Sequence, residues 1–208
     1  MSKLTLWGHA RSINVQKVLW GLDELGLEYE RVEVGGKFGR NKEPEYLALN
    51  PNGLIPTLVD GGEPLWESNA ILRYLFSRYG KAPLQPEGAL ERARADAFTE
   101  WYTSTLWPNV RPLLVQLVRT AEEQRDRRLI ESHLEQSLLA LTLLERELAK
   151  RSYLAGESFT FGDIPVGSAL QRWFNLPLKR PRQPALEAYY ARLSERPAFK
   201  RWLDLPLA

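Results

Sequence analysis

Hydrophobic positions in the first part of the chain change their spacing several times. They alternate with polar positions over residues 3–7, recur at the spacing of one helical face over 12–25, and alternate again over 29–34. Alternation predicts a strand, and recurrence every three to four residues predicts an amphipathic helix. A strand–helix–strand unit of this kind joins parallel strands. Ser12 stands at the junction where the first strand gives way to the helix.

A long polar loop follows, and 45–49 is predicted to form a short helical turn within it. The segments PTLVD and PLWES then flank GGE, which is a signal for a β-hairpin. Helical spacing returns over 68–79 and stops at Gly80. The order strand–helix–strand followed by strand–strand–helix predicts a mixed sheet with helices packed on it, which is the order of a thioredoxin-like fold.

The segment 81–87 contains two prolines and is predicted to be a linker, and strand signals cease beyond it. Helical spacing extends over 90–118, where Pro108 and Pro112 are predicted to kink or divide the helix. Further helices are predicted over 130–148, 159–174 and 184–203. We therefore predict an α/β domain over 1–80, a linker over 81–87 and an all-helical domain over 88–208.

The composition argues against several classes of ligand and catalytic site. Charged residues are interspersed and the formal net charge of the 208 residues is only +2, which gives no electrostatic case for nucleic acid or an anionic membrane. No run of 18 apolar residues predicts a membrane span, and the first residues lack the pattern of a secretory signal, so we expect a cytoplasmic protein. There is no cysteine, and the two histidines are His9 and His133. These counts predict no metal site and no cysteine nucleophile, so any sulfur chemistry must use sulfur that a ligand brings.

Thr160 and Asp163 have the spacing of a capping box, with Asp in place of the usual Glu or Gln. Phe159 and Ile164 occupy the positions of a hydrophobic staple beside them. Asp163 could also be a catalytic carboxylate. We favour the structural role for Asp163, because the local pattern accounts for both polar groups.

Five segments together, in their order and spacing, resemble the cytosolic glutathione transferases over the full length of the chain. They are GHARSINVQKV, NPNGLIPTLVD, LWESNAILRYL, FTFGDI and ERPAFKRW. The first resembles the strand–helix junction of the serine-type classes, similar to the bacterial theta- and phi-like ones. The resemblance implies glutathione as co-substrate, conjugation of its thiolate to small electrophilic compounds in detoxification, and a homodimer with one site per subunit.

The resemblance also implies how glutathione would be bound. The Ile55–Pro56 peptide bond would be cis and would turn the backbone of Ile55 toward the tripeptide, which would pair with it as an added strand. The start of the helix at Ser68 would bind the γ-glutamyl carboxylate, and Glu67 the ammonium group. The residues expected to bind glutathione are Lys42, Leu54, Ile55, Pro56, Glu67 and Ser68, with Lys42 near the glycyl carboxylate.

Two roles are open for Ser12. Serine is among the preferred N-cap residues, so its hydroxyl could cap the helix. Position 15 is valine, however, and the reciprocal half of a capping box is missing. The resemblance implies instead that Ser12 donates a hydrogen bond to the glutathione thiolate. Asn14 is the second candidate for this catalytic contact.

A pocket for the electrophile is expected between the two domains. Aromatic residues at helical spacing more often belong to a core, so this set is a weaker expectation. It comprises Trp7, Arg11, Phe38, Trp101, Tyr102, Trp107 and Arg111. Two alternative functions remain: glutathione-dependent reduction of disulfides or peroxides, with both sulfurs supplied by glutathione, and a non-catalytic module that binds ligands or proteins.

Overall fold

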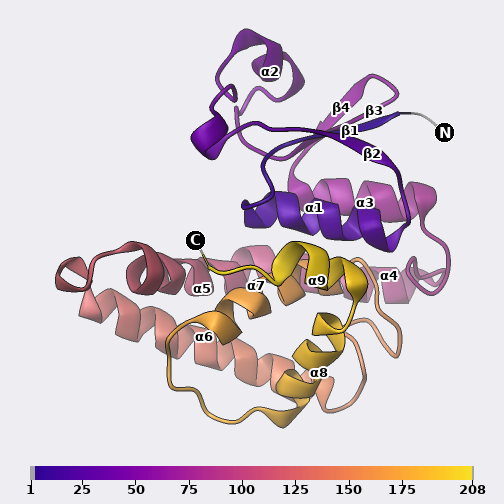
Figure 1. Cartoon of the computed structure of the whole chain (residues 1–208). Coiled ribbons are helices and arrows are strands. Elements are labelled where there is room, and N and C mark those ends of the chain that lie inside the picture. Colours follow the sequence, from indigo (N-terminus) through magenta and orange to yellow (C-terminus); the bar gives the residue numbers. More distant parts are fainter. Residues whose placement is uncertain (1–2, 208) are drawn as a thin grey trace. The chain divides into compact units, whose positions relative to one another are not determined.

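The computed structural model describes residues 3–207. It divides into two compact units, Met1–Lys81 and Ala82–Ala208. Within the described residues, the strands all belong to the first unit, while the second is built of helices (Figure 1). This is the thioredoxin-like unit followed by a helical unit that the sequence predicts.

The first unit contains a four-stranded mixed sheet with strand order β2-β1-β3-β4. The strands are β1 (Leu4–Trp7), β2 (Tyr29–Val32), β3 (Thr57–Asp60) and β4 (Glu63–Trp66). β1 pairs with β2 in parallel, and the other neighbours are antiparallel. The parallel pair is the strand–helix–strand unit of the sequence pattern, and the GGE turn joins the β3–β4 hairpin.

Three helices accompany the sheet: α1 (Ile13–Glu24), α2 (Pro44–Leu49) and α3 (Ser68–Tyr79). α1 and α3 lie side by side on one face, and α2 lies on the other side (Figure 1). The predicted apolar faces of α1 and α3 are buried, with Val18, Leu22 and Ile71 at 0% exposure. β2 is two residues shorter than predicted, because the chain turns away at Gly35, whose φ of 81° favours glycine.

The second unit is built of helices that follow one another along the chain. They are α4 (Ala89–Trp101), α5 (Trp107–Leu114), α6 (Arg127–Leu148), α7 (Asp163–Asn175), α8 (Pro184–Ser194) and α9 (Pro197–Leu203). Their core includes Leu113, Leu141, Ile164 and Leu170, each at 0% exposure. None of the helices within residues 3–207 is long and apolar enough to cross a membrane.

The predicted division of the 90–118 region is present, but it takes the form of widened helical turns. π-helical turns at Tyr102–Leu106 and Val115–Arg119 flank α5. Pro108 lies just after the first π-helical turn, as the second residue of α5, and Pro112 lies inside α5. The chain therefore continues through both prolines without a loop.

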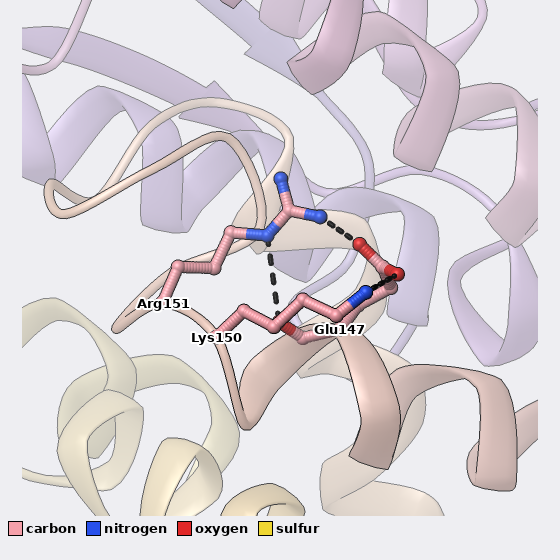
Figure 2. A network of polar contacts seen from close by, with 3 residues as sticks. All are labelled: Glu147, Lys150 and Arg151. Carbon is pink, nitrogen blue, oxygen red and sulfur yellow. Dashed lines mark hydrogen bonds and ion pairs between the residues drawn. The ribbon is translucent and has the colours of Figure 1, made fainter.

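The C-terminal end of α6 is closed by a small charged cluster (Figure 2). Lys150 Nζ lies 3.0 Å from the Glu147 carboxylate, and Arg151 donates to the same carboxylate and to the Glu147 carbonyl. Cations at this end also interact favourably with the helix dipole. At the other end, the Asp126 carboxylate accepts from the N–H of Leu129 at 3.1 Å.

At the start of α7, the Asp163 carboxylate accepts from the N–H of Thr160 at 2.8 Å, which confirms one half of the predicted capping box. The other half differs. The Thr160 hydroxyl donates to the same carboxylate at 3.1 Å, while the N–H of Asp163 donates to the Thr160 carbonyl. The carboxylate at 0% exposure is thus the acceptor at the centre of this turn.

Candidate functional site

The strand register brings three sequence motifs to one end of the sheet. Trp7, the last residue of β1, pairs with Thr57, the first residue of β3, and Thr57 pairs with Trp66, the last residue of β4. Neighbouring strands are about 4.8 Å apart. The segments that begin at Gly8 and at Glu67 and the segment that ends at Pro56 therefore meet along one short edge.

Ser12 occupies the N-cap position of α1 with extended backbone angles, φ −77° and ψ 126°. Its carbonyl accepts the first helical bond, from the N–H of Gln16 at 2.8 Å. Its hydroxyl makes no capping hydrogen bond in the described structure, although serine at this position usually does so. The half-buried hydroxyl of Ser12 thus lies beside the start of α1 without capping the helix.

The loop after β1 lies against the segment that contains Pro56. A Cβ atom added to Gly8 would lie 2.6 Å from Val15 and 3.5 Å from Ile55, and one added to Gly35 would lie 2.9 Å from Ile55. The side chain of Ile55 therefore lies close to both glycines, and it leaves no room for a Cβ at position 35. The Ile55–Pro56 peptide bond is cis, as the resemblance implies.

The backbone before Pro56 is held by side chains from α2 and its end. The Tyr46 hydroxyl donates to the Leu54 carbonyl at 2.6 Å and shares a hydrogen bond with Thr57 Oγ1 at 2.9 Å. Asn50 Nδ2 donates to the same carbonyl at 2.8 Å. The N–H and C=O of Ile55 have no hydrogen-bond partner within the described residues. A peptide ligand can therefore pair with them.

Lys42 is exposed, and its Nζ donates to the Asn52 carbonyl at 3.2 Å. Gly53 makes this possible, because a Cβ there would come within 2.6 Å of Lys42 Nζ. Asn41 donates to the Gly53 carbonyl at 2.8 Å and closes the same loop. The ammonium group of Lys42 is thus held next to the segment that leads to Leu54, whose side chain is exposed.

Glu67 and Ser68 form the junction between β4 and α3. Glu67 is the N-cap residue of α3 and has a φ of 69°, which is unusual for a residue with a side chain. Its side chain is exposed, whereas Ser68, the first residue of the helix, is buried. The N–H groups at the start of α3 therefore face the same edge of the sheet as Ser12 and Ile55.

The first-unit residues expected near an electrophile differ in their surroundings. Trp7 is half-buried, with its ring 6.0 Å from that of Tyr46 and under the guanidinium group of Arg40. Phe38 is exposed and its ring lies 6.2 Å from that of His9. Arg11 is exposed in the loop before Ser12. These side chains lie at or near the segments already described.

The imidazole of His9 lies in this loop as well. Burial lowers its pKa, with the carboxylate of Glu33 acting in the opposite direction and the charges of Arg31 and Lys37 adding to the decrease. His9 is therefore neutral at pH 7. A Cβ on Gly36 would lie 2.8 Å from His9 Nε2, so the ring packs directly against the loop after β2.

In the second unit, two of the four expected pocket residues pack against each other, and the other two have different surroundings. Tyr102 is buried at 2% exposure and its ring stacks on that of Trp107, with centroids 6.1 Å apart. Trp101 packs edge-on against Phe98. Arg111 is exposed on α5. Tyr102 thus belongs to the interior of its unit, and Trp107 covers it.

Sequence reasoning missed two residues that support this edge of the sheet, Lys17 and Tyr46. Tyr46 lies in the predicted short helical turn, and only its hydrogen bond to the Leu54 carbonyl shows its use. Lys17 is buried at 1% exposure in α1, where the helical spacing predicts a solvent-facing position. Within the described residues no group of three or more potential ligands could hold a metal ion.

Comparison with known proteins gives consistent results for both units. Residues 2–77 match the family model "Glutathione S-transferase, N-terminal domain", and residues 71–197 match "Glutathione S-transferase, C-terminal domain". The chain is 40% identical over 207 residues to glutathione S-transferase GstB of Escherichia coli K12, covering 99% of this chain and 100% of that protein.

Two solved structures similar to this chain are also glutathione S-transferases. The theta class glutathione S-transferase of Xanthomonas axonopodis pv. citri with glutathione bound is 47% identical, with a TM-score of 0.93 and coverage of 100% of both chains. Glutathione S-transferase I from maize in complex with an atrazine glutathione conjugate is 28% identical, with a TM-score of 0.87 and coverage of 98% and 97%. The chain therefore belongs to the glutathione S-transferase family and is a glutathione S-transferase.

Proposed function

We propose that this transferase conjugates the thiolate of glutathione to small electrophilic compounds and that the hydroxyl of Ser12 stabilises the thiolate. The observation that carries the proposal is the Ser12 hydroxyl, which stands at the N-terminal end of α1 and caps none of its N–H groups. Asn14, half-buried in the first turn of the same helix, is the second candidate for the contact to sulfur.

One hydroxyl and one helix N-terminus can supply the free energy needed to stabilise the thiolate. The thiol of glutathione, like that of free cysteine, has a pKa near 8.5, so little thiolate exists at pH 7. Lowering this pKa by about two units requires about 2.7 kcal/mol. A hydrogen bond to a charged group contributes about 1.5–3 kcal/mol. The N-terminal end of a helix adds about 0.3–1 kcal/mol.

The remaining groups would bind the rest of the tripeptide. The backbone of Ile55, unpaired within the described residues, would pair with the cysteinyl residue of glutathione. Ser68 and the first N–H groups of α3 would bind the γ-glutamyl carboxylate, with Glu67 at the ammonium group. Lys42 would meet the glycyl carboxylate. The glutathione-bound relative from Xanthomonas supports this choice of ligand.

In the reaction, the thiol first loses its proton to water, and the thiolate sulfur then forms a C–S bond with the electrophile. With an aryl halide, the carbon–halogen bond breaks and halide leaves with the electron pair. Ser12 keeps its proton throughout and forms no covalent bond. Conjugation to a small electrophile is consistent with the atrazine glutathione conjugate bound by the maize relative.

The test compares Ser12→Ala and Asn14→Ala with the unchanged protein, using a chromogenic aryl halide as the electrophile. Ser12→Ala is expected to lower kcat/KM at pH 6.5 by about 10- to 100-fold, since it removes about 1.5–3 kcal/mol of thiolate stabilisation. The dissociation constant of S-methylglutathione, which has no thiol, should change little. Full turnover in both variants would refute the assignment.

Two further measurements address the alternatives. Reduction of a small disulfide by glutathione, measured beside conjugation, separates a reductase from a conjugating transferase. Retention on immobilised glutathione separates an enzyme of this kind from a non-catalytic module. The homodimer stays a prediction, and sedimentation would test it against the chain mass of 23.9 kDa.

A further inference from the structure

Lys17 is a buried charged residue of the first unit. It lies in the middle of α1, its exposure is 1%, and its Nζ donates to Asn69 Oδ1 at 2.8 Å. Asn69 is the second residue of α3 and directly follows Ser68. The lysine therefore connects α1, which begins after Ser12, with the start of the helix that follows Glu67.

Packing alone does not require a lysine at this place. Removing an ammonium group from water costs several kcal/mol, and hydrophobic residues of similar volume in place of buried charges are often neutral or stabilising. Burial lowers the pKa of Lys17 to about 7, against the carboxylate of Glu67, which raises it. Packing of α1 on α3 would be satisfied by methionine or leucine, so the ammonium group serves something other than packing.

The junction next to Lys17 is strained. Glu67 adopts a φ of 69°, and a residue with a side chain adopts this strained backbone region only when its surroundings hold it there. No side chain caps α3 within the described residues, and the N–H of Ile71 donates to the Glu67 carbonyl at 2.9 Å. Lys17 acts on both flanks of the buried Ser68: it binds Asn69 and attracts the carboxylate of Glu67.

We propose that Lys17 is a positioning residue for glutathione: its buried ammonium group binds Asn69 and fixes the left-handed junction that presents Ser68 and the first N–H groups of α3 to the γ-glutamyl carboxylate. The proposal rests on the proposed function. Lys17 follows Ser12 by five residues, about 7.5 Å along the helix axis. One helix thus sets the distance between the thiolate end and the γ-glutamyl end of the ligand.

The experiment measures three quantities on five proteins: the dissociation constant of S-methylglutathione by calorimetry, and KM for glutathione and kcat with an aryl halide. The proteins are the unchanged chain, Lys17→Met, Lys17→Arg, Asn69→Ala and the control Lys200→Met, at an exposed position of α9. Lys17→Met is expected to raise the dissociation constant and KM about tenfold, as loss of one charge-assisted contact implies, and to leave kcat within about threefold.

Lys17→Arg should recover most of the affinity, Asn69→Ala should weaken binding about threefold, and Lys200→Met should change nothing. Since methionine removes a buried charge, Lys17→Met should melt no lower than the unchanged protein, so weak binding cannot be attributed to unfolding. Unchanged affinity in both Lys17→Met and Asn69→Ala overturns the proposal.

A fall in melting temperature with unchanged affinity also overturns it, because that is the signature of a purely structural lysine. If Lys17→Met does not fold, Asn69→Ala and Lys17→Arg decide: affinity that is reduced in the first and retained in the second supports the proposal, and equal affinities refute it. If the unchanged protein itself does not bind S-methylglutathione, the proposed function fails, and the role of Lys17 fails with it. That result is distinct from a failure confined to the variants.

Discussion

Replacing Asp163 by alanine should destabilise the helical unit without impairing catalysis. The carboxylate is fully buried and accepts four hydrogen bonds. Its Oδ1 accepts from the N–H of Leu154 at 3.0 Å and from the Tyr189 hydroxyl at 2.8 Å. Its Oδ2 accepts from the N–H and the hydroxyl of Thr160 at 2.8 and 3.1 Å. Asp163→Ala leaves all four donors without this acceptor.

Each buried donor left without an acceptor costs about 1–3 kcal/mol, but the four share one carboxylate and their costs do not add. Loss of the one acceptor that these four buried donors share is therefore expected to cost about 3–5 kcal/mol in total. In a chain of 208 residues each kcal/mol lowers the melting temperature by about 2–4 °C. Asp163→Ala should therefore lower it by about 6–20 °C.

Thermal unfolding followed by circular dichroism measures the shift, and kcat is measured well below the transition. Tyr189→Phe is the matched control: it removes one of the four donors and should lower the melting temperature by only about 2–4 °C. A shift below about 2 °C for Asp163→Ala, together with a tenfold loss of kcat, would refute the structural role and return Asp163 to the catalytic candidates.

Two further predictions concern the first unit. Tyr46→Phe removes the hydroxyl that donates to the Leu54 carbonyl. Denaturant unfolding should show a free energy of unfolding lower by about 1 kcal/mol, and steady-state kinetics should show a severalfold higher KM for glutathione. An unchanged KM would contradict the positioning role of Tyr46. The pKa of Lys17 is about 7 when folded and 10.5 when unfolded, so the folded state binds this proton less well. The unfolding free energy of the unchanged protein should rise relative to that of Lys17→Met between pH 7 and 9, by at most about 1.4 kcal/mol per pH unit, and a constant difference would contradict the shift.

The elements of the first unit could be predicted from the sequence because their signals are local. The spacing of Val15, Val18 and Leu22 places α1 within one residue of its observed start, and the GGE turn defines the β3–β4 hairpin. The end of β2 was predicted too late, because alternation continues through Val34 while the glycine geometry at Gly35 already turns the chain. Hydrophobic spacing carries no information about that geometry.

The candidate site was predictable only as separate motifs. The motifs at Ser12, Pro56 and Ser68 come from the resemblance, and their meeting point depends on the pairing of Trp7 with Thr57, fifty residues away in the chain. No local pattern encodes this register. The same limit hides Tyr46, since its hydrogen-bond acceptor is a backbone carbonyl that any residue at position 54 would provide.

Lys17 is a buried charged residue whose position hydrophobic spacing does not predict. In α1 all eight residues from Val15 to Leu22 are buried, so the helix has no solvent face over this length and spacing cannot separate inside from outside. In such a helix a charged residue needs a partner from elsewhere in the chain, because an unpaired ammonium group would not be tolerated. Here the partner is Asn69, at the strained junction next to Ser68. A charge retained in a fully buried helix therefore indicates a junction that must be held in place, and in this protein that junction is one end of the proposed glutathione site.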